Sequence, residues 1–134
     1  MTFEMPLMNV TMEAGEDLSA ASVIGKIVKF DTNGRVVVCT GVTDKPVGIL
    51  QDNANSSAVG SSVTVMVAGI SKVQGDADLS IGDLFGTSAD GQAAAYAPGT
   101  DTTKYILGRV WKDNSAAGGF ATVIFSCLGA SRGA

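Results

Sequence analysis

The feature that most constrains this chain is its regular alternation of short apolar runs with glycine-containing turns. Glycine accounts for 17 of the 134 residues, whereas aromatic residues make up only 6%. Because glycine adopts the positive φ angles of tight turns and weakens long helices, this composition favours many short strands. The alternation begins at Gly25. We therefore expect an all-β fold, a small β-barrel or sandwich-like single domain with short helical turns and an extended N-terminal arm.

Runs of β-branched and apolar residues give the positions of the expected strands. The clearest is a hairpin between residues 26–30 and 35–40, because Asn33-Gly34 suits the positive φ angles of a two-residue turn. Short helical turns are expected at 17–24 and in the Ala-rich segment 92–97. Further strands are expected at 47–50, 62–68, 69–74, 83–87, 105–111 and 120–128.

Two stretches share an order of elements: a glycine that opens a strand, a glycine turn, and a later strand led by glycine. We interpret them as two related β-halves that wrap one core, although Gly-rich β sequences also give such matches by chance. The members are Gly25, Asn33-Gly34 and Gly48-Ile49-Leu50 in the first stretch, and Gly82, Asp90-Gly91 and Gly108-Arg109-Val110 in the second.

Composition and charge exclude several classes of function. Hydrophobic residues form 46% of the chain, which is enough to bury a core, and the net charge of −4 with scattered basic residues argues against nucleic-acid binding. No apolar run approaches the roughly 20 residues of a membrane-spanning helix. The start also lacks the basic region of a signal peptide. We expect a protein that is made and kept in the cytosol and that binds neither nucleic acid nor a membrane.

The residues of common enzyme sites are missing. There is no histidine, so Ser-His and Cys-His nucleophiles are excluded, and two cysteines without histidine cannot form a zinc site within one chain. Cys39 and Cys127 each lie in an apolar run and are expected to be buried, reduced thiols rather than a disulfide. No phosphate-binding loop is present. We expect no enzymatic activity, no catalytic residues, no metal and no cofactor.

Two weaker patterns deserve comparison with known sites. Asp76, Asp78 and Asp83 resemble part of a calcium loop, but Gly82 is displaced and Thr87 stands where a bidentate glutamate is needed, which favours a solvated loop. Asp44-Lys45 before Pro46 resembles the lysine turn of lipoyl and biotinyl carriers. The alternative function is therefore a small β carrier or binding module of the lipoyl type, with Lys45 as attachment site.

Residues 1–13 differ from the rest, which we treat as a body of residues 14–134. Four of the five methionines fall there, and Pro6 disfavours a central strand. Flexible, polarizable methionines suit adhesion to an apolar groove on another subunit, so we predict an adhesive N-terminal arm. The alternative is an ordinary first strand of the core. The predicted arm residues are Phe3, Met5, Leu7, Met8, Val10 and Met12.

From Ala14 to Leu128, the order of short motifs resembles the phage head-decoration family, also called capsid cement proteins. One departure is the loop 53–61, which is rich in Ser and Asn where a more acidic turn is expected. The motifs are Gly25-Lys26-Ile27-Val28, Asn33-Gly34, Pro46 to Leu50, Val63 to Gly69 with Lys72-Val73, Leu79 to Asp83, Asp90-Gly91-Gln92, Ile106 to Val110, and Ala116 to Gly119.

The resemblance implies a compact β-barrel-like body, commonly a homotrimer. It also implies that the partner is the major capsid protein and that the subunit sits on the outer surface of the expanded head in the virion. The N-terminal arm would then be a capsid-binding arm that grips the shell. A subunit that binds only the assembled lattice stabilises it by mass action.

Overall fold

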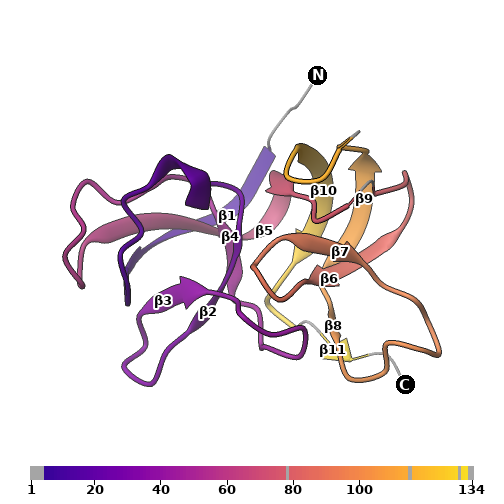
Figure 1. Cartoon of the computed structure of the whole chain (residues 1–134), viewed down its shortest axis with the longest axis horizontal. Coiled ribbons are helices and arrows are strands. Elements are labelled where there is room, and N and C mark those ends of the chain that lie inside the picture. The colour runs from indigo at the N-terminus through magenta and orange to yellow at the C-terminus, as the bar shows by residue number, and fades with distance from the viewer. Residues whose placement is uncertain (1–4, 78, 115, 130, 133–134) are drawn as a thin grey trace.

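The computed structural model describes residues 5–77, 79–114, 116–129 and 131–132, and within them it is almost entirely β (Figure 1). The expected all-β class is confirmed. The helical content of these residues is one 3-10 turn, η1 (Ala21–Val23), inside the segment 17–24. The strands are β1 (Met5–Glu13), β2 (Ile27–Phe30), β3 (Val36–Val38), β4 (Gly48–Leu50), β5 (Ser62–Gln74), β6 (Leu84–Thr87), β7 (Ala93–Ala95), β8 (Tyr105–Ile106), β9 (Gly108–Lys112), β10 (Phe120–Ser126) and β11 (Ser131–Arg132).

The long strand β5 joins the two sides of the molecule. The main sheet runs in the order β3-β2-β4-β5-β10-β9-β6-β7, and β1 is added to β5. Strands β8 and β11 form a separate pair. In Figure 1 the indigo-to-magenta elements β1 to β4 lie on the left and the orange-to-yellow elements lie on the right. Because β5 belongs to both sides, they cannot separate as independent domains.

The topology confirms the two related halves. In each half a hairpin is followed by a strand that returns to pair with the hairpin's first strand and then with a long strand: β2-β3, β4 and β5 in one, β6-β7, β9 and β10 in the other. The registers also correspond, since Val28 pairs with Val38 in the first hairpin and Phe85 with Ala95 in the second. The opening glycines Gly25 and Gly82 both have positive φ angles, +86° and +89°.

Each half curls into a small barrel, so the expected single core is instead two clusters. A bridge from Ala14 to Val36 closes the first half, and one from Gly75 to Ala93 closes the second. The first barrel is filled by Ala14, Leu18, Val28, Val36, Leu50, Ala54, Val63, Val65 and Val67. The other cluster combines the interior of the second barrel with outward-facing residues of the first: Ile27, Cys39, Ile49, Met66, Val73, Leu79, Phe85, Ala93, Leu107, Val110, Ala121, Val123 and Phe125.

The helical turn predicted for 92–97 is wrong, because Ala93–Ala95 forms strand β7. Alanine favours a helix on local propensity, but here it pairs with β6 after a turn at Gly91, whose φ is +78°. Ala93 is fully buried, so tertiary packing decides the conformation. Two further boundaries differ: 62–74 is one strand instead of two, and 105–111 is divided into β8 and β9.

The hairpin at Asn33-Gly34 is present, with a loop of three residues instead of the expected two. The Asp31 N–H donates to the Arg35 carbonyl at 2.8 Å, which leaves Thr32 to Gly34 in the loop. Gly34 has φ +74°, as the last residue of such a loop requires. The Asp31 carboxylate accepts hydrogen bonds from the N–H groups of Asn33 and Arg35, which fixes the turn.

Among the described residues, no helix has the length and apolar character needed to cross a membrane.

Candidate functional site

The segment predicted as an N-terminal arm forms, in its described part, an apolar strand at the edge of the sheet. Residues 5–13 run antiparallel to residues 62–70 of β5, with irregular pairing on either side of Met8. In the described part of the chain, β1 pairs with β5 alone. Its side chains from Met5 to Thr11 are exposed, and Leu7 is 78% exposed. At its far end Met12 packs against the first barrel's core, so β1 is anchored there.

Gly69 is what allows β1 to lie against β5. Its φ is +134°, and a Cβ added there would lie 2.6 Å from the Met5 carbonyl oxygen and 2.7 Å from the Leu7 nitrogen. Real Cβ atoms do not approach backbone atoms this closely, so glycine is required for the contact. The sequence places a strand boundary at Gly69, where the structure has a docking point for β1.

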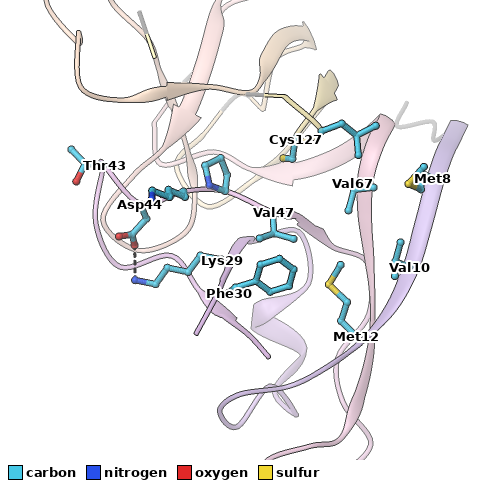
Figure 2. Close-up of a pocket in the computed structure, with 13 residues that line it drawn as sticks. Met8, Val10, Met12, Lys29, Phe30, Thr43, Asp44, Val47, Val67 and Cys127 are labelled. Atoms are coloured by element: carbon cyan, nitrogen blue, oxygen red, sulfur yellow. Dashed lines mark ion pairs between the residues drawn. The ribbon is translucent and has the colours of Figure 1, made fainter. Parts of the chain in front are cut away.

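One face of β1 borders an apolar groove of about 820 Å³. Met8, Val10 and Met12 project from β1 toward Phe30 and Val47 on the opposite wall (Figure 2). The structure therefore brings together three of the predicted arm residues. Although Phe30 ends a core strand, it is 51% exposed and available to a partner. The other lining residues are Lys29, Thr43, Asp44, Lys45, Pro46, Val67, Cys127 and Leu128.

A smaller hollow of about 320 Å³ lies beside the first residues of β1. Met5 and Leu7, also predicted arm residues, line it together with Ile124 of β10. Phe3, the remaining predicted residue, lies outside the described residues. Sequence reasoning missed Phe30, Ile124 and Leu128, because each lies in an apolar run that reads as core. The rest of the lining is Pro6, Ala68, Gly69, Ile70, Phe125, Ser126 and Leu128.

An ion pair fixes the polar rim of the groove. Lys29 Nζ lies 2.8 Å from Asp44 Oδ2, and the same oxygen accepts hydrogen bonds from the N–H groups of Thr40 and Gly41. Burial alone would raise the pKa of Asp44, but the Lys29 hydrogen bond and the two backbone N–H groups outweigh it, and the pKa is lowered. The hydrogen bond to Asp44 raises the pKa of Lys29. Both groups are therefore charged at neutral pH.

Lys45 does not occupy a hairpin turn. It lies, exposed, in the loop between β3 and β4, and these strands flank β2 instead of pairing with each other. A carrier lysine of the lipoyl type needs the tip of a turn between two adjacent strands. Lys45 instead lies at the edge of the apolar groove, next to the buried Pro46.

The two cysteines are free thiols, as predicted. Cys39 is buried, as expected, whereas Cys127 is half-buried instead of buried. Burial raises the pKa of each thiol to about 12, so both stay protonated at neutral pH and are poor nucleophiles. They contribute to packing, since Cys39 belongs to the core cluster and Cys127 packs against it.

The acidic residues of the 76–90 region do not form a metal site where the structure describes them. Asp78 lies outside the described residues, and no group of three His, Cys, Asp or Glu side chains within them could hold a metal ion. Asp83 caps its own turn by accepting a hydrogen bond from the Ser80 N–H at 3.2 Å. Burial, and then the nearby charge of Asp90, raises the pKa of Asp76.

No protein-family model matches the sequence, and no curated protein matches it. Among solved structures, the chain matches the crystal structure of the N base of the head fiber gp8.5 of bacteriophage phi29, with a TM-score of 0.66. The match covers 90% of this chain and 96% of that chain. The chain resembles a phage head-fiber base in fold. Because the two sequences are only 16% identical, the match shows a likeness of fold alone.

Proposed function

We propose that this chain is a non-enzymatic structural protein of a phage virion, a decoration subunit that binds the outer surface of the assembled head and stabilises it. The observation that carries the proposal is the likeness, over 90% of the chain, to the base of a phage head fiber. The sequence motifs from Ala14 to Leu128 support the same class independently, since they resemble head-decoration proteins.

We assign the contact with the major capsid protein to β1 and the apolar groove beside it. An edge strand with a free side can pair with an extended segment of another protein, and neighbouring pockets then receive its side chains. Met8, Val10 and Phe30 supply apolar contact surface, with exposed fractions of 44%, 36% and 51%. Apolar clusters of this kind on a small protein commonly mark interaction sites.

The stabilising effect follows from mass action. A ligand that binds the assembled shell and not its free subunits adds about 2.7 kcal/mol per site at a hundredfold excess over Kd. In our proposal the subunit is a homotrimer, so each particle engages several lattice sites and a modest affinity per site suffices. No chemical step is required of the protein.

Co-sedimentation with expanded capsids of the phage that encodes the chain tests this function. Wild type should bind saturably, whereas Met8→Asp and Phe30→Asp should bind at least about tenfold more weakly, since each places a charge in an apolar contact. Val59→Asp is the matched control, because Val59 is 55% exposed and lines neither hollow. Failure of the wild type to bind would overturn the function. Normal binding by both groove variants would move the contact elsewhere on the subunit.

A further inference from the structure

Three basic side chains lie on the outer face of the second barrel, where β10 runs between β5 and β9 (Figure 1). Thr122 of β10 pairs with Lys72 of β5 on one side and with Lys112 of β9 on the other. Two residues further along β10, Ile124 pairs with Arg109. Directly paired residues point to the same side of a sheet, and so do residues two apart along a strand. The three basic residues therefore share one face with Ile124.

An irregularity in β9 brings two of these charges to the same face. Arg109 and Lys112 are three residues apart, so in a regular strand their side chains would point to opposite sides. The register of β9 against β10 shifts between Val110 and Lys112, which makes Trp111 an extra, bulged residue. Val110 is buried, whereas Lys112 is exposed. The bulge therefore turns Lys112 away from the core and toward solvent.

The three strands supply no carboxylate to offset these charges. Strands β5, β9 and β10 contain no Asp or Glu, and none of the three basic groups forms an ion pair with another residue that the structure describes. Arg109 donates one hydrogen bond to the Gly82 carbonyl at 2.8 Å, which leaves other N–H groups of its guanidinium for a partner. The Lys72 ammonium lies 5.5 Å from the centre of the Phe120 ring and keeps its charge.

Large apolar side chains accompany the charges. Ile124 is 52% exposed, Phe120 45% and Trp111 38%. Tryptophan and arginine are the residues most enriched at the energetic centres of protein interfaces, and the arginine guanidinium matches the geometry of a carboxylate. We call this surface, made of Lys72, Arg109, Trp111, Lys112, Phe120 and Ile124, the basic face. It offers cations to carboxylates and apolar area to the side chains between them.

We infer that the basic face binds a short acidic segment of another protein, in which Asp or Glu is interspersed with apolar residues. The three basic side chains contribute +3 to a formal net charge of −4, so the remainder of the chain carries −7. A nucleic acid is an extended polyanion that reaches beyond the face and is repelled by this charge, whereas a short acidic segment can stay within it. The inference goes beyond the proposed function, because no residue of the basic face other than Ile124 lines either hollow beside β1.

Fluorescence anisotropy with a short labelled peptide of Glu, Leu and Ser tests the inference, and a counterpart with Gln in place of Glu is its control. Wild type should bind the Glu peptide, more weakly as salt is added, and should not bind the Gln peptide. Arg109→Glu and Lys112→Glu should each weaken binding at least about tenfold, because each places a like charge against the peptide. Both positions are exposed, so the fold should persist, which far-UV circular dichroism establishes.

Two further measurements locate the binding site. Lys45→Glu is the matched control variant, because Lys45 is also exposed and the change in net charge is the same, but it lies at the groove and outside the basic face. Its affinity should stay within about twofold of wild type. Trp111 is the single tryptophan of the chain, so its emission should shift when the peptide covers the face.

Equal binding of the Glu and Gln peptides, or no binding of either, would overturn the inference. Equal affinities of Arg109→Glu, Lys112→Glu and Lys45→Glu for the Glu peptide would overturn the assigned face. Tighter binding of a single-stranded oligonucleotide of the same charge would overturn the choice of a protein segment over a nucleic acid. Each of these outcomes leaves capsid binding to its own assay.

Discussion

Replacing Gly69 by alanine should detach the first residues of β1 from the sheet. A non-glycine residue at φ +134° is strained by about 1–3 kcal/mol. The new Cβ would also lie 2.6 Å from the Met5 oxygen and 2.7 Å from the Leu7 nitrogen, against at least 3.4 Å for ordinary contact. Separation of the strands would forfeit roughly two ladder hydrogen bonds, at about 1 kcal/mol each. The expected total loss is about 3–5 kcal/mol.

Chemical denaturation measures this loss, and for a chain of this size it corresponds to a fall in melting temperature of about 10–20 °C. The sharper test is a double-mutant cycle with a truncation that removes residues 1–8. Without those residues the steric clash is gone, so Gly69→Ala should cost only the φ strain, and the coupling energy should be about 2 kcal/mol. An equal cost of Gly69→Ala in the full-length and truncated chains would refute the role assigned to Gly69.

Three further predictions concern stability. Gly34→Val should lower the free energy of unfolding by about 1–3 kcal/mol through strain at φ +74°, whereas Gly34→Asn should lower it much less because asparagine tolerates this conformation. Equal melting temperatures for the two variants would contradict this. Asp44→Asn should cost about 1 kcal/mol at neutral pH. The pKa of Asp44 is lowered in the folded protein, so the ionised carboxylate stabilises the fold above the unfolded pKa, near 4. This stabilisation is lost as the pH falls through the folded pKa. The melting temperatures of wild type and Asp44→Asn should therefore converge at acidic pH. Asn114→Ala should lower the free energy of unfolding by about 2–4 kcal/mol, because the buried amide accepts a hydrogen bond from the Leu79 N–H and donates to the carbonyls of Ala77 and Ala116. A change below about 0.5 kcal/mol in urea denaturation would exclude that role.

The features that local chemistry determines were predictable from the sequence. Asn33-Gly34 indicates its hairpin because the required φ angles are a property of the turn itself. The repeated glycines indicate two related halves. A further signal of the repeat is Asp17-Leu18-Ser19, which recurs as Asp78-Leu79-Ser80, with Leu18 and Leu79 both 1% exposed.

The features that depend on distant partners were not predictable. Ala93–Ala95 is a strand only because the second barrel places a partner strand and a core beside it. Likewise, Met66 and Ile124 are both apolar strand residues, and only the stacking of one barrel on the other decides which of them is buried. The composition of residues 5–12 indicates an apolar contact segment, but nothing local specifies that it pairs with β5 or that Phe30 faces it.

The most direct test of the central claim is a cryo-electron microscopy reconstruction of expanded heads, prepared with and without the purified chain. Decoration predicts added density on the outer surface at repeated lattice positions, into which the paired barrels fit with β1 and its groove against the shell. It also predicts that decorated heads withstand a higher temperature than bare ones. Identical maps with and without a saturating concentration of the chain would contradict the account.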